Sequence, residues 1–162
     1  MTSTSNTINI LIVDDHLLFA EGIKAYLGKL AQTVRIDIAT QGSKCLRQLE
    51  ISNPYHIIIL DLFMPDLNGS DMIMAIRKRN IATPILVISA ESDHGAIHKV
   101  LALGASGFVS KSAAPGTMLV AVEEILKGGS YLDPSILPPT TPEQKAPKTS
   151  VPPRTLAVLK LV

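Results

Sequence analysis

The chain has 162 residues, 46% of them hydrophobic but only 4% aromatic, and carries a formal net charge of +1. This length accommodates one domain and a short additional segment, and the near-neutral charge gives no reason to expect a nucleic-acid or membrane partner. A single cysteine, Cys45, excludes an intrachain disulfide, and no apolar run approaches the roughly 20 residues that span a bilayer, so we expect a cytoplasmic protein.

Residues 8–127 alternate between aliphatic runs and amphipathic helical patterns, whereas residues 1–7 are polar and form a predicted disordered tail. That tail has no basic residue and no apolar run, which excludes a signal peptide. The predicted strands are residues 8–13, 34–38, 56–60, 85–89 and 106–110. The predicted helices are residues 16–29, 42–50, 69–79, 92–103 and 115–127, with Ser92 capping the fourth.

This alternation predicts a single α/β domain over residues 8–127. The run at 57–60 contains no polar residue, which is typical of a strand buried on both faces of a parallel sheet. We expect a doubly wound, five-stranded parallel sheet of order 2-1-3-4-5, with right-handed crossovers and helices on both faces.

The composition changes after Ser130. Seven of the eleven prolines lie between Pro134 and Pro153, among threonines, lysines and serines. We interpret residues 128–152 as a Pro-rich linker that is semi-extended where prolines cluster. Residues 153–162 then show a helical pattern whose apolar side chains have no partner, so we interpret them as the truncated start of a second domain.

Polar side chains follow the predicted strands at their carboxyl ends: Asp14 and Asp15, Asp61, Ser89, and Lys111. Because these ends meet at one edge of a parallel sheet, we expect the five side chains to lie close together. Three carboxylates repel one another unless a cation joins them, and Mg²⁺ suits two or three such ligands. A lysine adds a positive charge for a phosphoryl group. The set predicts phosphoryl transfer through an aspartyl-phosphate, with Asp61 as the nucleophile.

Four motifs in this order and spacing resemble the receiver domain of two-component response regulators over about residues 8–127. The motifs are VDDH at 13–16, DLFMPDLNG at 61–69, ISA at 88–90 and GASGFVSK at 104–111. Residues 152–162 are similar to the first helix of the NarL/FixJ (LuxR-type) helix-turn-helix domain. The resemblance implies a CheY-like receiver followed by a helix-turn-helix domain that is cut short within its first helix, at residues 153–162.

The resemblance also implies roles for the residues at the strand ends. Asp61 accepts a phosphoryl group from a phosphohistidine on a sensor histidine kinase. Asp14 and Asp15 hold Mg²⁺, with help from Asp61 and the backbone carbonyl of Phe63. Lys111 pairs with the phosphoryl oxygens. Such a domain is a signalling domain rather than an enzyme, with at most intrinsic autophosphorylation and autodephosphorylation.

Four residues are implied to act after phosphorylation. Ser89 and Phe108 form the switch, in which the hydroxyl moves to the phosphoryl group and the aromatic ring turns inward. Phe63 and Glu91 flank the site and tune the lifetime of the aspartyl-phosphate. For His16, a place near the metal is one interpretation, and a polar residue at the start of a helix is the favoured one.

The implied output is transcriptional regulation. The resemblance also implies formation of a homodimer on phosphorylation, DNA contact only through the missing C-terminal domain, and no membrane partner. An alternative is a receiver that acts through protein contacts without DNA. A Mg²⁺-dependent phosphatase with an aspartate nucleophile fits less well, because its nucleophile follows the first strand and its second acid lies two residues further on. A flavodoxin-like electron carrier would need a phosphate-binding loop after the first strand. The carboxylates of Asp14 and Asp15 at that place would repel a phosphate, so this alternative fits poorly.

Overall fold

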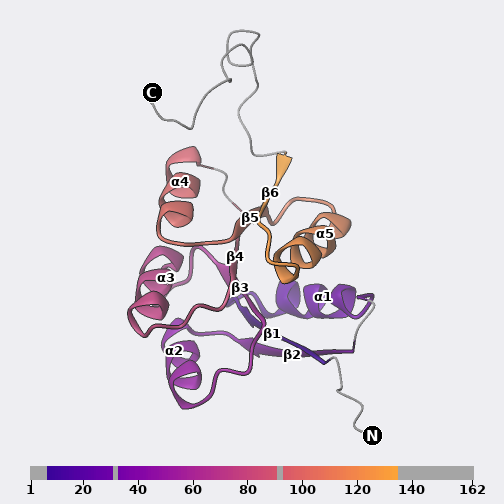
Figure 1. Ribbon diagram of the computed structural model, residues 1–162. Helices are drawn as coiled ribbons and strands as arrows, with labels where there is room; N and C mark the ends of the chain where they lie inside the picture. The colour runs from indigo at the N-terminus through magenta and orange to yellow at the C-terminus, as the bar shows by residue number, and fades with distance from the viewer. Residues whose placement is uncertain (1–6, 31–32, 91–92, 135–162) are drawn as a thin grey trace, which may run out of the picture.

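The computed structural model describes residues 7–30, 33–90 and 93–134 and folds them around one six-stranded sheet (Figure 1). Three of the sequence-based predictions lie outside these residues. They concern the tail before residue 7, the side chain of Glu91, and residues 135–162 with most of the predicted linker and the predicted helix at 153–162.

Every strand pairs in parallel with its neighbours, in the order β2-β1-β3-β4-β5-β6. The strands are β1 (Ile8–Val13), β2 (Val34–Ala39), β3 (Ile57–Asp61), β4 (Ile85–Ser89), β5 (Gly107–Ser110) and β6 (Tyr131–Leu132). All residues of β3, β4 and β5 are buried, as expected of aliphatic strands covered on both faces. The edge strand β2 is only partly buried, in agreement with its alternating polar residues.

Five helices cover the sheet, within a few residues of the predicted bounds. They are α1 (Leu17–Leu27), α2 (Gly42–Ile51), α3 (Gly69–Lys78), α4 (His94–Ala102) and α5 (Pro115–Leu126). The prediction that Ser92 caps the fourth helix is wrong. The cap is Asp93, because its carboxylate accepts a hydrogen bond from the backbone N–H of Ala96, so the helix begins one residue later.

Two apolar layers lie on opposite faces of the sheet. Helices α1 and α5 pack on one face and α2, α3 and α4 on the other (Figure 1). Alternate residues of each central strand serve the two layers, so that Ile57 and Ile59 face α1 and α5 while Ile58 and Leu60 face the other three helices. The doubly wound α/β fold is therefore confirmed. Within the described residues, no helix has the length and apolar character that crossing a membrane requires.

The sheet has six strands rather than the five predicted. Tyr131 and Leu132, the fourth and fifth residues of the predicted linker, pair with Gly107 and Phe108 of β5. The strands approach so closely that a Cβ at position 107 would collide with the carbonyl oxygen of Tyr131. A two-residue strand after a Gly-Gly pair carries no periodicity, so the sequence gives no sign of β6.

Candidate functional site

The predicted acidic residues meet at the carboxyl ends of β1 and β3. These two strands are neighbours at the centre of the sheet, where the chain order reverses and α/β proteins bind their ligands. Asp14 follows β1 directly and Asp61 is the last residue of β3. Their side chains are almost completely buried, whereas the side chain of Asp15 is 27% exposed.

Buried carboxylate oxygens in this cluster lack hydrogen bonds. Oδ2 of Asp14, Oδ1 of Asp15 and Oδ2 of Asp61 accept none from any residue that the structure describes. The ammonium of Lys111 lies near two of these oxygens, but one positive charge does not balance three carboxylates, and proteins tolerate such a cluster where a further cation or ligand completes the site. The cluster therefore fits an oxygen-seeking divalent cation.

Burial, and after it the negative charge of Asp14, raise the pKa of Asp61 to about 6, although the Lys111 ammonium acts in the opposite direction. The physical cause is that two acids compete for one poorly solvated space. A cation bound between them would restore the charged form of Asp61. The charged form is the one that can act as a nucleophile.

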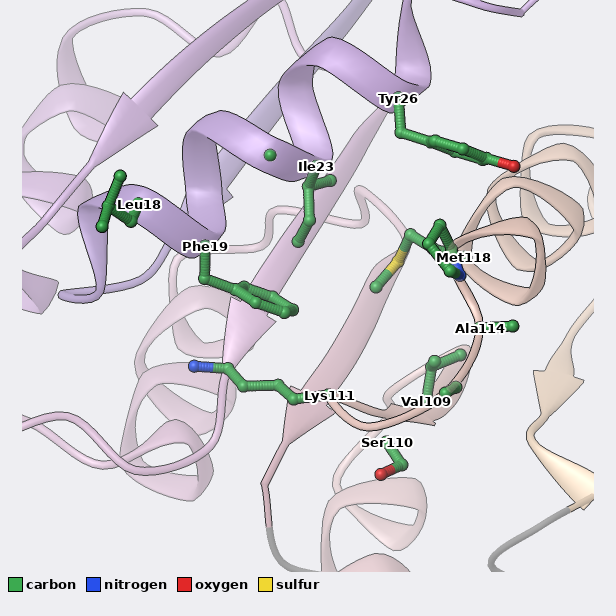
Figure 2. Close-up of a pocket in the computed structure, with 12 residues that line it drawn as sticks. Leu18, Phe19, Ile23, Tyr26, Val109, Ser110, Lys111, Ala114 and Met118 are labelled. Carbon is green, nitrogen blue, oxygen red and sulfur yellow. The ribbon is translucent and has the colours of Figure 1, made fainter.

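Lys111, which follows β5, reaches into the cluster. Its Nζ lies 2.9 Å from Oδ2 of Asp14 and 3.4 Å from Oδ2 of Asp61. The ammonium also lies 4.8 Å from the centre of the Phe19 ring. Figure 2 shows the lysine extended below that ring, at one end of a cavity of about 350 Å³ between α1 and the start of α5. The side chain thus joins the cavity to the acids.

His16 also belongs to the cluster, which the sequence analysis did not favour. Its Nδ1 lies 3.2 Å from Asp14, 3.5 Å from Asp15 and 3.9 Å from Asp61, and 3.1 Å from Nζ of Lys111. The nitrogen can donate to a carboxylate or accept from the lysine, but not both. His16 does precede α1 as predicted, but its ring makes no capping hydrogen bond. One ligand atom from each acid and from the imidazole lie within 4.8 Å of one another.

The remaining predicted site residues surround this cluster. Ser89 ends β4 and is fully buried, and the Phe108 ring is also fully buried, opposite Val87 two residues earlier in β4. Phe63 lies just beyond β3 and is 49% exposed. Glu91 lies outside the described residues. The geometry brings Ser89 to the same sheet edge as Asp61 and places Phe108 deeper in the core.

The loop after Asp61 is held by contacts that the sequence did not reveal. The carboxylate of Asp66 accepts hydrogen bonds from the backbone N–H groups of Gly42 and Ser43, and the bonds from Ser43 lower the pKa of Asp66 most. Gly69 lies against the loop's own start, since a Cβ there would lie 2.8 Å from Cα of Leu62. The loop is therefore closed and anchored to the first turn of α2.

The fold and the site together define a class of protein: doubly wound α/β domains with an acidic cluster and a lysine at the point where the strand order reverses. The sequence profile of the response regulator receiver domain matches residues 10–123, well over half of the chain. The chain belongs to the response regulator receiver family, and the CheY-like fold that was predicted is confirmed.

Similar proteins come from the same family. The transcriptional regulatory protein DegU of Brevibacillus brevis is 31% identical over 81% of this chain and 55% of its own length. The DNA-binding transcriptional activator EvgA of Escherichia coli K12 is 31% identical over 76% of this chain and 60% of its own. A LuxR-family response regulator from Aurantimonas superposes with a TM-score of 0.74 at 29% identity, covering 81% of this chain and 93% of that one.

These similarities confirm the predicted NarL/LuxR grouping within the response regulators. The chain spans only 55% to 60% of the two curated relatives it matches.

Proposed function

We propose that Asp61 accepts a phosphoryl group from a phosphohistidine of a sensor histidine kinase. In this step an oxygen of the Asp61 carboxylate attacks phosphorus and the phosphorus–nitrogen bond of the phosphohistidine breaks. The histidine nitrogen leaves with the bonding electron pair and takes up a proton. The product is an aspartyl-phosphate at the carboxyl end of β3.

The observation that carries this proposal is the buried Oδ2 of Asp61, which accepts no hydrogen bond from a described residue and faces the ammonium of Lys111. The oxygens of Asp14, Asp15 and Asp61 and the carbonyl of Phe63 would hold a Mg²⁺ ion, which would neutralise charge on the acids and on the transferred group.

The surrounding residues take the roles that the family resemblance implies. Lys111 pairs with the phosphoryl oxygens as a point charge. The Ser89 hydroxyl moves to the phosphoryl group and the Phe108 ring occupies the inner position of the switch. Phe63 and Glu91 flank the phosphoryl group and set its lifetime by controlling the approach of water.

A protein donor agrees with the apolar surface beside the site. Leu17 and Leu18, at the start of α1, are 52% and 90% exposed, next to His16 at the mouth of the acidic cluster. The cavity between α1 and α5 continues this surface (Figure 2). Exposed apolar patches at a reactive site are typical of a protein–protein contact, so we place the kinase there.

Labelling with acetyl phosphate tests the assignment of Asp61. With Mg²⁺ and this small donor, the chain should gain one hydroxylamine-labile phosphate by its intrinsic activity, and Asp61→Asn should gain none. The control is Asp71→Asn, which changes an exposed acid in the first turn of α3 and should be labelled like the parent. Labelling of Asp61→Asn at the parental level would refute the assignment.

We further infer that phosphorylation favours self-association and controls DNA binding by a domain that follows the linker. The relatives' names support a transcriptional output. In the full-length gene product, a phosphodonor should increase the fraction of a promoter duplex that is bound to the protein, and Asp61→Asn should abolish this increase. An equal response from both proteins would contradict the inference, and absence of DNA binding would favour the alternative of protein contacts alone.

A further inference from the structure

A buried carboxylate at the end of β6 contacts the strand that carries the site lysine. Asp133 is 3% exposed, and its Oδ2 accepts a hydrogen bond of 3.1 Å from the backbone N–H of Ser110, the last residue of β5. Its own backbone N–H donates to the carbonyl of Phe108 at 3.0 Å. Asp133 therefore bonds to β5 at two successive points, one through its backbone and one through its side chain.

The side chain of Asp133 continues the β5–β6 ladder where the strand itself stops. The N–H groups of Tyr131 and Asp133 donate in turn to the carbonyls of Ser106 and Phe108, as in an ordinary parallel pair. The next donor on β5 is the N–H of Ser110. It donates to the carboxylate of Asp133 instead of to a backbone carbonyl. A hydrogen bond to a carboxylate is stronger than one between two neutral groups.

Ser110 is held through each of its polar groups. Its carbonyl accepts from the N–H of Ala113 at 3.1 Å, and its hydroxyl lies 2.7 Å from the hydroxyl of Ser112. The following N–H, of Lys111, donates to the carbonyl of Ser89 in β4 at 2.8 Å. The two consecutive amides are thus fixed from opposite sides, that of Ser110 by Asp133 just after β6 and that of Lys111 by β4. This arrangement sets the direction in which Lys111 leaves the sheet.

We propose that Asp133 is a positioning residue for Lys111. By fixing the amide of Ser110, it aims the lysine stem along Phe19 and brings the ammonium to the oxygens of Asp14 and Asp61. The effect of Asp133 on phosphorylation rests on the proposed function of Asp61. Because coupling between two sites is reciprocal, a phosphoryl group that shifts Lys111 would also act on β6.

Two substitutions at one position separate the acceptor oxygen from the rest of the side chain. Asp133→Asn keeps an oxygen that can accept from Ser110, whereas Asp133→Ala removes it. With acetyl phosphate and Mg²⁺, Asp133→Ala should be labelled at least about tenfold more slowly, because small displacements of a catalytic group cost large factors in rate. Asp133→Asn should stay within about twofold of the parent under the same geometric argument. Equal rates for Asp133→Ala and the parent would overturn the proposal.

A matched control lies at the opposite edge of the sheet. Asp37 of β2 accepts a hydrogen bond of 2.7 Å from the Tyr55 hydroxyl, so Asp37→Ala also removes a carboxylate acceptor at the edge of the sheet. It should leave the labelling rate unchanged. A fall like that of Asp133→Ala would mean that the loss reflects general destabilisation, and the positioning role would be refuted.

A double-mutant cycle shows whether Asp133 acts through Lys111. In a Lys111→Met background, Asp133→Ala should cause no further loss of labelling rate, since the group that it positions is gone. The same tenfold loss there would overturn the proposal. Amide exchange at Ser110 provides a second measurement that needs no phosphorylation: protection should fall in Asp133→Ala and persist in Asp133→Asn. If the parent protein itself gained no phosphate, the proposed function of Asp61 would be refuted. The amide exchange of Ser110 would still show whether Asp133 holds this part of β5.

Discussion

Replacing Asp61 by asparagine should stabilise the metal-free protein at neutral pH while abolishing its capacity to accept phosphate. The pKa of Asp61 is raised to about 6 in the folded protein, first by burial and then by the charge of Asp14, against an ordinary value of 3.8. Between these two pH values the folded state holds a proton that the unfolded state has released. Stability therefore falls as pH rises through this window.

The size of the effect follows from the two pKa values. Each pKa unit corresponds to 1.36 kcal/mol, so a difference of about two units makes ionised Asp61 cost about 3 kcal/mol above pH 6. Below pH 3.8 the acid is neutral in both states and the cost disappears. Asparagine has a similar shape and no charge at any of these pH values. The variant should gain about 3 kcal/mol over the parent at pH 7 and almost nothing near pH 3.5.

Urea unfolding followed by far-ultraviolet circular dichroism measures this gain. Parent and Asp61→Asn are compared in EDTA at several pH values between 3.5 and 7.5, with Asp71→Asn as an exposed acid that should give no comparable gain. Added Mg²⁺ should narrow the difference at pH 7, since the ion compensates the same charge. A stability difference that does not change with pH, or a variant less stable than the parent at pH 7, would refute the electrostatic reasoning.

Three further perturbations test the site and its supports. Mg²⁺ at a hundredfold excess over its Kd should stabilise the parent by about 2.7 kcal/mol, and Asp15→Ala should lose most of the accompanying rise in Tm; an unchanged rise would count against the metal site. Tyr55→Phe should lose about 1.5–3 kcal/mol in urea unfolding, because the buried hydroxyl donates to Asp37 at 2.7 Å; a neutral result would show that this bond contributes nothing. Gly69→Ala should cost about 1–3 kcal/mol, because a Cβ would lie 2.8 Å from Cα of Leu62, and parental stability would show that the loop yields freely.

The sequence could predict the centre of the site because that centre depends on strand order alone. Aliphatic runs mark the strands, and an acid or a lysine directly after such a run must emerge at the shared carboxyl edge. Asp14, Asp61 and Lys111 follow from this rule without knowledge of any side-chain conformation. The same reasoning explains why the doubly wound sheet and the helix bounds were predicted within a few residues.

Other features depend on geometry that a pattern does not carry. His16 lies at the start of a helix, and only the direction of its ring decides whether it caps the helix or faces the acids. Ser92 and Asp93 are both good capping residues, and the hydrogen bond to Ala96 selects the second. Strand β6 is two residues long, so Asp133 could not be recognised as a partner of β5.

Strand β6 also decides how the edge of the sheet meets solvent. An uncovered edge strand offers free backbone groups to other chains, and proteins protect such edges with charged residues or short strands. At one edge β2 carries Arg35 and Asp37, and at the other Tyr131 and Leu132 cover β5. A fragment that ends before residue 131 would expose the backbone of β5 beside the buried Phe108 ring. Self-association of such a fragment would then be caused by its uncovered edge strand and not by phosphorylation of Asp61.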